Sequence, residues 1–204
     1  MPLLGTGSAV DSILSSLQAM GSGIKAMSYD PQLAVSATNP ADQTLRLIRI
    51  DVTSQILVTG VKMLLAGSLT ALGTSPAKNK VALYGLGTTG ISLLAASADT
   101  PTLLTQSAGL VGAAFTAPVT IPAGVYWAGI LSALGTGPTG AATQACRVAP
   151  LSSVSSTLDL PANVKSNMSM TGQSDLPGAI GTPNVPLWTA LSNNASTQPF
   201  VVLY

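Results

Sequence analysis

Apolar positions along the chain follow two patterns, and the change falls near residue 43. Between residues 8 and 20 they recur every three or four positions, as in an amphipathic helix. From residue 44 onward, short apolar runs are separated by Gly, Pro and Asn, with turn signals about every 8 to 12 residues. Such spacing is typical of an antiparallel β-sandwich or jelly roll. We therefore predict an all-β protein with an N-terminal arm, short helix and linker (residues 1–42) and a β-sandwich domain (residues 43–204).

The expected helix has a well-defined apolar stripe. Ser8 fits an N-cap, Asp11 suits the positive end of the helix dipole, and Gly21 ends the pattern. A helix this short is marginal alone, so it should dock on its own domain, on a second copy or on a larger particle. The residues expected to make this contact are Val10, Ile13, Leu14, Leu17 and Met20. Residues 27–42 read as a linker because they contain Pro31, Asn39 and Pro40.

Strand faces can be assigned in two of the apolar runs. Alternation places Val81 and Leu83 on one face of a strand and its neighbours Ala82 and Tyr84 on the other. Tyr126 and Trp127 should likewise point to opposite faces of a core strand. Thr59–Gly60 reads as a turn, and residues 150–195 read as ordered loops over one end of the sandwich. The predicted strands are 45–52, 55–58, 61–65, 81–84, 102–106, 113–117, 119–121, 125–132, 142–148 and 198–204.

Charge is scarce in this chain. It has 8 Lys and Arg and 7 acidic residues, all of them Asp, among 204 residues, and 47% of its residues are hydrophobic. Ordinary soluble domains carry roughly 25% charged residues. Such a chain lies in a membrane or is covered by other protein chains, because charge helps to keep proteins apart. Proline and glycine interrupt every long apolar run, so we expect no membrane span, and the N-terminus lacks the basic region of a signal peptide.

The residue types needed for common catalytic sites are missing. The chain has no His and no Glu, which excludes the Ser-His-Asp and Cys-His arrangements and the usual zinc sites. Cys146 stands alone and is expected to be a small buried hydrophobe. Scattered Lys and Arg make no basic patch for nucleic acid. Asp51, Asp99, Asp159 and Asp175 could pair as acid and base or hold calcium, but no two acids are close in sequence. We predict no enzyme, cofactor or metal.

Residues Gly85 to Gly90 match G-x-G-x-x-G and follow a predicted strand. In dinucleotide-binding folds this loop precedes a helix, and an acid about 20 residues later binds the ribose. Positions 100 to 146 contain no acid, and Asp99-Thr100-Pro101 limits any helix that follows. The segment therefore predicts a hairpin turn.

Two tryptophans could form a sugar-binding face. Trp127 and Trp188, with Tyr84 and Tyr126, could stack against sugar rings, although core packing is the more frequent role of such residues in a sandwich. Both interpretations remain open at this point, and burial of the indoles would decide against the sugar site.

Several short strings resemble a β-sandwich module of bacteriophage minor tail proteins and of tail fibre, head fibre or decoration proteins. One hairpin, Val81–Tyr84 with Ile91–Ala95, is similar to the module's "gLYd..G.lla.t" pattern, and Ala117–Ala128 is similar to its "apvtLpaGtYy.a.l" pattern. Ser174–Pro177 and Pro186–Leu191 resemble its late loop and Trp segment. The resemblance spans residues 44–204 and leaves the N-terminal helix outside. Gly85 stands where the module commonly has Asp.

The resemblance implies a non-enzymatic virion protein that is a minor tail, tail-tip or fibre component. Such a protein would assemble through its N-terminal segment with other virion proteins and with copies of itself, a trimer being favoured. The alternatives are a capsid decoration or head-fibre protein and a carbohydrate-binding host-attachment module, whose partner would be a host-surface glycan.

Overall fold

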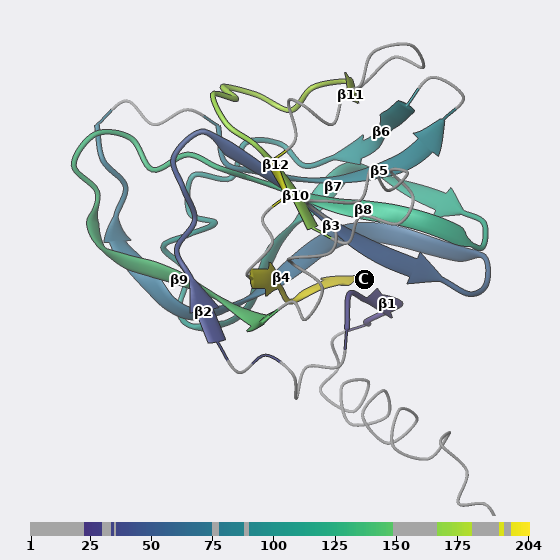
Figure 1. Cartoon of the computed structure of the whole chain (residues 1–204), viewed down its shortest axis with the longest axis horizontal. Coiled ribbons are helices and arrows are strands. Elements are labelled where there is room, and N and C mark those ends of the chain that lie inside the picture. Colours follow the sequence, from purple (N-terminus) through teal and green to yellow (C-terminus); the bar gives the residue numbers. More distant parts are fainter. Residues whose placement is uncertain are drawn as a thin grey trace, which may run out of the picture.

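Two antiparallel β-sheets packed face to face make up the described part of the chain (Figure 1). The computed structural model describes residues 23–29, 34, 36–74, 78–87, 90–148, 167–180, 192–193 and 197–204. The predicted all-β, antiparallel sandwich is confirmed for these residues. The expected helix at residues 8–20 lies outside them.

The first sheet, named here the β4 sheet, contains the longest strand. Its hydrogen-bonded order is β1-β14-β4-β9-β13, with β7 also paired to β4 and β2 to β9. Figure 1 shows β1 beside the C-terminal end of the chain, in agreement with its pairing to β14. The strands are β1 (Ala26–Met27), β2 (Ser36–Thr38), β4 (Ile56–Ala71), β7 (Gly109–Ile121), β9 (Thr139–Val148), β13 (Thr197–Pro199) and β14 (Val201–Leu203).

The second sheet, named here the β8 sheet, is built around the predicted core strand. Its order is β11-β6-β5-β8-β3-β10-β12. An isolated bridge between Ser97 and Phe115 joins the end of β6 to β7, so the two sheets meet along one side. The strands are β3 (Thr44–Val52), β5 (Lys80–Gly87), β6 (Gly90–Ala96), β8 (Gly124–Ser132), β10 (Asn167–Met170), β11 (Ala179–Ile180) and β12 (Ser192–Asn193).

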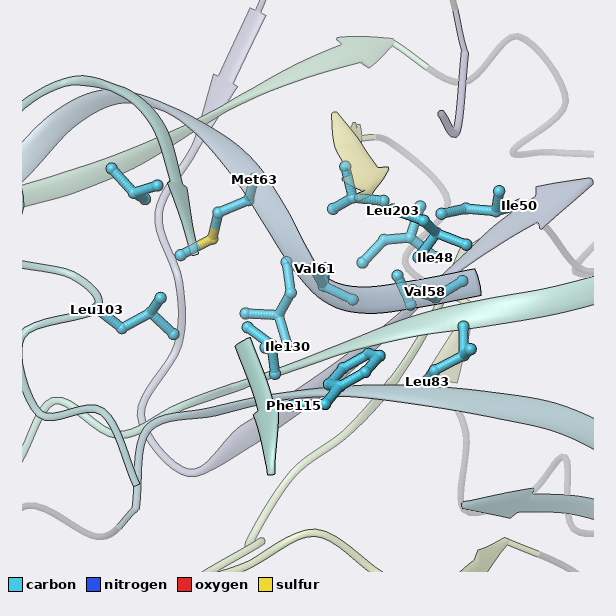
Figure 2. Packing of buried hydrophobic residues seen from close by; sticks show 14 of the residues in the cluster. Ile48, Ile50, Val58, Val61, Met63, Leu83, Leu103, Phe115, Ile130 and Leu203 are labelled. Carbon is cyan, nitrogen blue, oxygen red and sulfur yellow. The ribbon is translucent and has the colours of Figure 1, made fainter. Parts of the chain in front are cut away.

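The main core lies between the two sheets, and Figure 2 shows Val61, Met63, Phe115 and Ile130 from facing strands packed within it. Val81 and Leu83 point into this core, whereas Ala82 and Tyr84 belong to a second cluster on the outer face of the β8 sheet. Tyr126 and Trp127 divide in the same way. The predicted strand faces are therefore confirmed. The second cluster comprises Leu45, Leu47, Ala82, Tyr84, Ile91, Trp127, Leu131, Met168 and Ile180.

A third cluster covers part of the outer face of the β4 sheet. Ile24 and Tyr29 precede the predicted domain boundary at residue 43, yet they pack on Phe200 and Val202. Tyr29 and Phe200 meet edge to face, with ring centroids 5.4 Å apart. Both outer faces of the sandwich thus carry apolar residues beneath other parts of the chain.

The segment predicted as a linker, residues 27–42, contributes strand β2 and the last residue of β1 to the β4 sheet. β1 pairs with β14, and β2 pairs with β9. Strands of two and three residues are too short to show an alternating pattern, because strand periodicity needs at least four residues to be recognised. The sheet therefore begins upstream of residue 43.

The predicted turn at Thr59–Gly60 is wrong, because β4 continues through both residues. The register to β7 shifts between Val58 and Gly60, which marks a β-bulge. At this bulge Thr59 N donates to the main-chain oxygen of Tyr204 at 2.6 Å, and Thr59 Oγ1 donates to the same oxygen at 2.8 Å. A Cβ on Gly60 would lie 2.5 Å from both Tyr204 Oη and the Ala113 carbonyl oxygen. Glycine here permits close approach rather than chain reversal.

The two strands predicted at 113–117 and 119–121 form one strand, β7. Pro118 does not end it, since the β7 residues between Ala114 and Val119 have no partner in the register to β4. Proline is tolerated at a bulge, where its missing N–H leaves no ladder bond unmade.

Residues 102–106 were predicted as a strand, and this is wrong as well. They form tight turns in which Leu103 N donates to Thr100 O at 2.9 Å and Thr105 N donates to Thr102 O at 3.1 Å. Leu103 and Leu104 are fully buried in the main core. Their apolar character reflects burial at the end of the sandwich rather than sheet pairing.

Residues 150–195 were predicted as loops, but strands β10, β11 and β12 lie within this range and belong to the β8 sheet. Between β10 and β11, residues 171–178 lie against this sheet as a strap. Leu93 N donates to Gly178 O at 2.9 Å, and Tyr84 Oη donates to Pro177 O at 3.1 Å. Leu176 packs on the second cluster. Lys80 Nζ lies 2.7 Å from Asp175, and Lys78 also pairs with this carboxylate. The apolar run at the C-terminal end is paired as predicted, with β13 on β9 and β14 on β4.

Candidate functional site: an apolar cleft between two hairpins

A shallow cleft of about 470 Å³, named here the hairpin cleft, lies between the β5–β6 and β7–β8 hairpins. Two of its residues, Leu86 and Leu94, are 55% and 43% exposed and lie together, so the cleft carries an apolar patch. The lining residues are Gly85, Leu86, Leu94, Val119, Thr120, Ile121, Pro122, Gly124, Val125 and Tyr126.

Leu94 is exposed because the register between β5 and β6 shifts beside it. Leu83 pairs with Ala95 and Tyr84 pairs with Leu93, so Leu94 is the extra residue of a bulge. Its side chain lies over Gly85, where a Cβ would come within 2.8 Å of Leu94 Cδ1. Gly85 is paired across the sheet with Tyr126. A glycine between a leucine and a tyrosine leaves the floor of the cleft open.

This arrangement confirms the hairpin predicted for the glycine-rich string. Gly85, Gly87 and Gly90 belong to the paired strands β5 and β6, and Gly87 lies directly opposite Gly90. A nucleotide-binding loop instead places its glycines before a helix N-terminus.

The hairpin cleft offers apolar contacts and almost no charge. Tyr126 is the lining residue with an ionisable side chain, and its phenol donates to the Pro122 carbonyl oxygen at 3.0 Å. Desolvation raises the pKa of Tyr126 above its ordinary value, so this phenol stays neutral at physiological pH. Such a cleft can bind apolar side chains, but its lining contains no acid or base suited to proton transfer near pH 7.

A second hollow of about 510 Å³, named here the entry hollow, lies where the described chain begins. Leu57, its most prominent residue, is 52% exposed. Tyr204 forms one wall, and Lys62 Nζ lies 4.5 Å from the centroid of its ring, within cation–π range. The residues that line it are Gly23, Lys25, Gln55, Ile56, Leu57, Thr59 and Tyr204.

Three of the four candidate acids each have a hydrogen-bond or ion-pair partner, and the three lie in separate parts of the fold. Arg49 donates to Asp51 at 2.8 Å, and Asn79 N donates to Asp99 at 2.8 Å. Hydrogen bonds from two lysines hold the pKa of Asp175 well below its ordinary value, while Asp175 in turn raises the pKa of Lys78. Asp159 lies outside the described residues. Within the described ranges, no group of three His, Cys, Asp or Glu side chains could hold a metal ion.

The structure does not support Trp127 as a sugar platform. Its side chain is fully buried in the second cluster, with an exposed fraction of 0%, so neither ring face is available to a sugar. Tyr84, in the same cluster, is equally buried, and burial raises its pKa. Trp188 falls among the residues that the structure does not describe, as do the helix residues Val10, Ile13, Leu14, Leu17 and Met20.

Cys146 is buried in the sheet, as expected of a small hydrophobe, and is not part of a disulfide. The unexpected neighbour is Arg46, which points into the space between the sheets and is only 5% exposed. Its Nη2 donates to the Asn39 carbonyl oxygen at 3.1 Å, but its buried Nε has no hydrogen-bond partner.

The exposed leucines of the two hollows were not predicted from the sequence. Leu57, Leu86 and Leu94 all lie in apolar runs that read as ordinary strands. Their exposure depends on which neighbouring strand ends or bulges beside them, and no local pattern carries that information.

The chain matches no protein-family model and no curated protein. No helix in the described ranges is long and apolar enough to cross a membrane.

Proposed function

We propose that the chain is a non-enzymatic structural protein of a bacteriophage particle. In this role it is a minor tail, tail-tip or fibre component that assembles through its N-terminal segment and leaves the sandwich exposed. The observation that carries the proposal is the hairpin cleft, an apolar surface on a chain with very little charge. A surface of this kind suits contact with another protein better than chemistry on a substrate.

The sequence resemblance supports the same proposal from another direction. The strings similar to the phage module, Val81–Tyr84 with Ile91–Ala95 and Ala117–Ala128, fall on the two hairpins that form the cleft. The proposed partner of the cleft is therefore a neighbouring virion protein. Copies of the chain itself, as a trimer, belong to the same proposal.

The experiment is mass spectrometry and electron cryo-microscopy of particles grown from the genome that encodes the chain. The chain is expected in purified particles at a defined copy number, and the image distinguishes a tail position from capsid decoration. Absence of the chain from intact particles would overturn the proposal.

A variant with both Leu86→Asp and Leu94→Asp tests the part played by the cleft. Both side chains are exposed, so the substitutions should leave the core intact while desolvated carboxylates oppose binding. Incorporation into particles is expected to fall, whereas the control Thr139→Asp, at an exposed position of β9, should assemble normally. Normal incorporation of the double variant would exclude the hairpin cleft as a second contact with the particle, beside the N-terminal segment.

A further inference from the structure

The entry hollow is an apolar surface at the point where the described chain starts. Gly23, the first described residue, itself lines the hollow, and Leu57 beside it is 52% exposed. Leu57 and the apolar part of the lining together form an exposed surface on which another segment can pack.

The 22 residues before Gly23 carry an apolar stripe that needs a partner. The stripe ends at Met20, and only Gly21 and Ser22 separate it from Gly23. Three consecutive Cα–Cα steps of about 3.8 Å span at most about 11 Å, so Met20 cannot lie far from the rim of the hollow. A segment of the same chain so close to the hollow has a high effective concentration there compared with any other protein.

The backbone near the rim allows the chain to turn back over the sheet. Gly23 has a φ of +60°, in the left-handed region that favours glycine, and a Cβ added there would meet nothing within 4 Å. Gly21 stands directly after the apolar stripe, the usual position of a left-handed glycine that ends a helix. Gly21 and Gly23, with one residue between them, would allow the backbone to reverse its direction sharply.

Charge at the hollow also fits this segment. Lys25 lines the hollow and Lys62 stacks on the ring of Tyr204, while the lining residues include no acid. Residues 1–22 contain Asp11 and no Lys or Arg side chain. The side chains of the hollow and of the segment therefore carry no like charges that would oppose docking.

We propose that residues 8–20 dock on the entry hollow of their own chain, with the apolar stripe covering Leu57 and the ring of Tyr204. This docking does not depend on the proposed virion role. It leaves an outward face of Asp11, Ser12, Ser15, Ser16 and Gln18, which is polar and carries one negative charge. Within an assembly, a neighbouring chain would meet the docked segment and the sandwich as one surface.

Disulfide trapping in the full-length protein tests the proposal. Leu57→Cys is combined with Leu17→Cys on the apolar stripe, and a matched control combines Leu57→Cys with Ser15→Cys on the opposite face. Native Cys146 has an exposed fraction of 0%, and peptide mapping shows which cysteines are joined. The Leu17→Cys pair is expected to form an intrachain disulfide about tenfold faster than the control pair, given the difference in effective concentration.

Each other outcome overturns the proposal. A disulfide-linked dimer from the Leu17→Cys pair would show that the hollow binds the segment of a second copy. Equal rates for the two pairs would show that no defined face docks, and absence of a disulfide from both would show that the segment lies elsewhere.

Hydrogen exchange gives a second measurement that needs no cysteine. In full-length Leu17→Asp, the amides of residues 55–59 are expected to exchange faster than in wild type, because a buried carboxylate displaces the segment. The control Ser15→Asp should leave their exchange unchanged. Equal exchange in wild type and Leu17→Asp would contradict docking at this surface.

Discussion

Replacing Arg46 by Met is expected to stabilise the protein. The guanidinium lies between the sheets at 5% exposure, and no carboxylate among the described residues pairs with it. Burial lowers its pKa, which means that the folded environment disfavours the charged form. Transferring an ion of this size into a protein interior costs several kcal/mol after relaxation, and good hydrogen bonds are needed to offset that cost.

The hydrogen bonds of Arg46 offset only part of the cost of burying its charge. Nη1 donates to Gln144 Oε1 at 3.4 Å and Nη2 donates to Thr38 Oγ1 at 3.5 Å, both near the limit for such bonds. The better bond goes to the carbonyl oxygen of Asn39, an exposed residue that water can reach in the variant. The main loss is at buried Gln144, which is left with one unsatisfied acceptor at a cost of about 1–3 kcal/mol.

The expected net change for Arg46→Met is therefore a gain of about 1–3 kcal/mol in the free energy of unfolding. Methionine keeps most of the aliphatic volume and is flexible enough to fill the space. For a chain of this length each kcal/mol corresponds to a rise in Tm of about 2–4 °C. Urea unfolding followed by far-UV circular dichroism and tryptophan fluorescence measures the change, with an unchanged m value as the check that both states are comparable.

Two further variants separate charge burial from a general effect of substitution. Arg46→Lys keeps the buried charge but loses the planar set of donors, so it should be less stable than wild type. Arg49→Met removes a partly exposed arginine that pairs with exposed Asp51, and its effect should stay within about 1 kcal/mol. A loss of stability above about 1 kcal/mol in Arg46→Met would refute the reasoning, since the hydrogen bonds would then outweigh the cost of desolvation.

Three other predictions concern separate parts of the fold. Gly60→Ala should lower the free energy of unfolding by about 1–3 kcal/mol, because the added Cβ would lie 2.5 Å from a backbone oxygen and from the phenol oxygen of Tyr204. The control Gly178→Ala, whose Cβ would meet nothing within 4 Å, should be neutral in the same urea titration. Asp175→Asn should cost up to about 1 kcal/mol at pH 7, since this partly exposed carboxylate bridges two lysines. The pKa of Asp175 is lowered in the folded state, so this stabilisation is present above the unfolded pKa of about 3.9 and is lost as the pH falls below that value. The urea midpoints of variant and wild type should therefore converge in acid. A constant difference between the midpoints would contradict the assignment. In a Trp188→Phe background, buried Trp127 should resist acrylamide quenching and show no change in emission with added sugars, and ready quenching would contradict its burial.

The alternation of side chains along strands could be predicted from the sequence because it is a local property. A period of two residues separated Val81 and Leu83 from Tyr84 in one strand and Tyr126 from Trp127 in another, as the structure has them. The scarcity of charge, the absence of His and Glu, and the glycine hairpin at Gly85 to Gly90 are likewise read from composition and short strings.

Only the tertiary structure decided where strands continue, bulge or end. Gly60 and Pro118 have the appearance of turn residues, but Gly60 accommodates the ring of Tyr204, 144 positions later in the chain, and Pro118 lies where β7 has no partner on β4. Leu103 looks like a strand residue, but it is buried at the end of the core in a tight turn. These outcomes depend on contacts between residues distant in the sequence, and a local pattern contains no information on such contacts.

The same division holds for the candidate sites. The apolar stripe of residues 10–20 is visible in the sequence because helix periodicity is local, whereas the hollow proposed to receive it combines Gly23, Leu57 and Tyr204 from three distant parts of the chain. Leu86 and Leu94 become a surface only because a bulge in β6 and a glycine in β5 leave them uncovered. Composition predicts that the chain has protein partners, and the packing of the two sheets decided which apolar residues of the described ranges remain exposed.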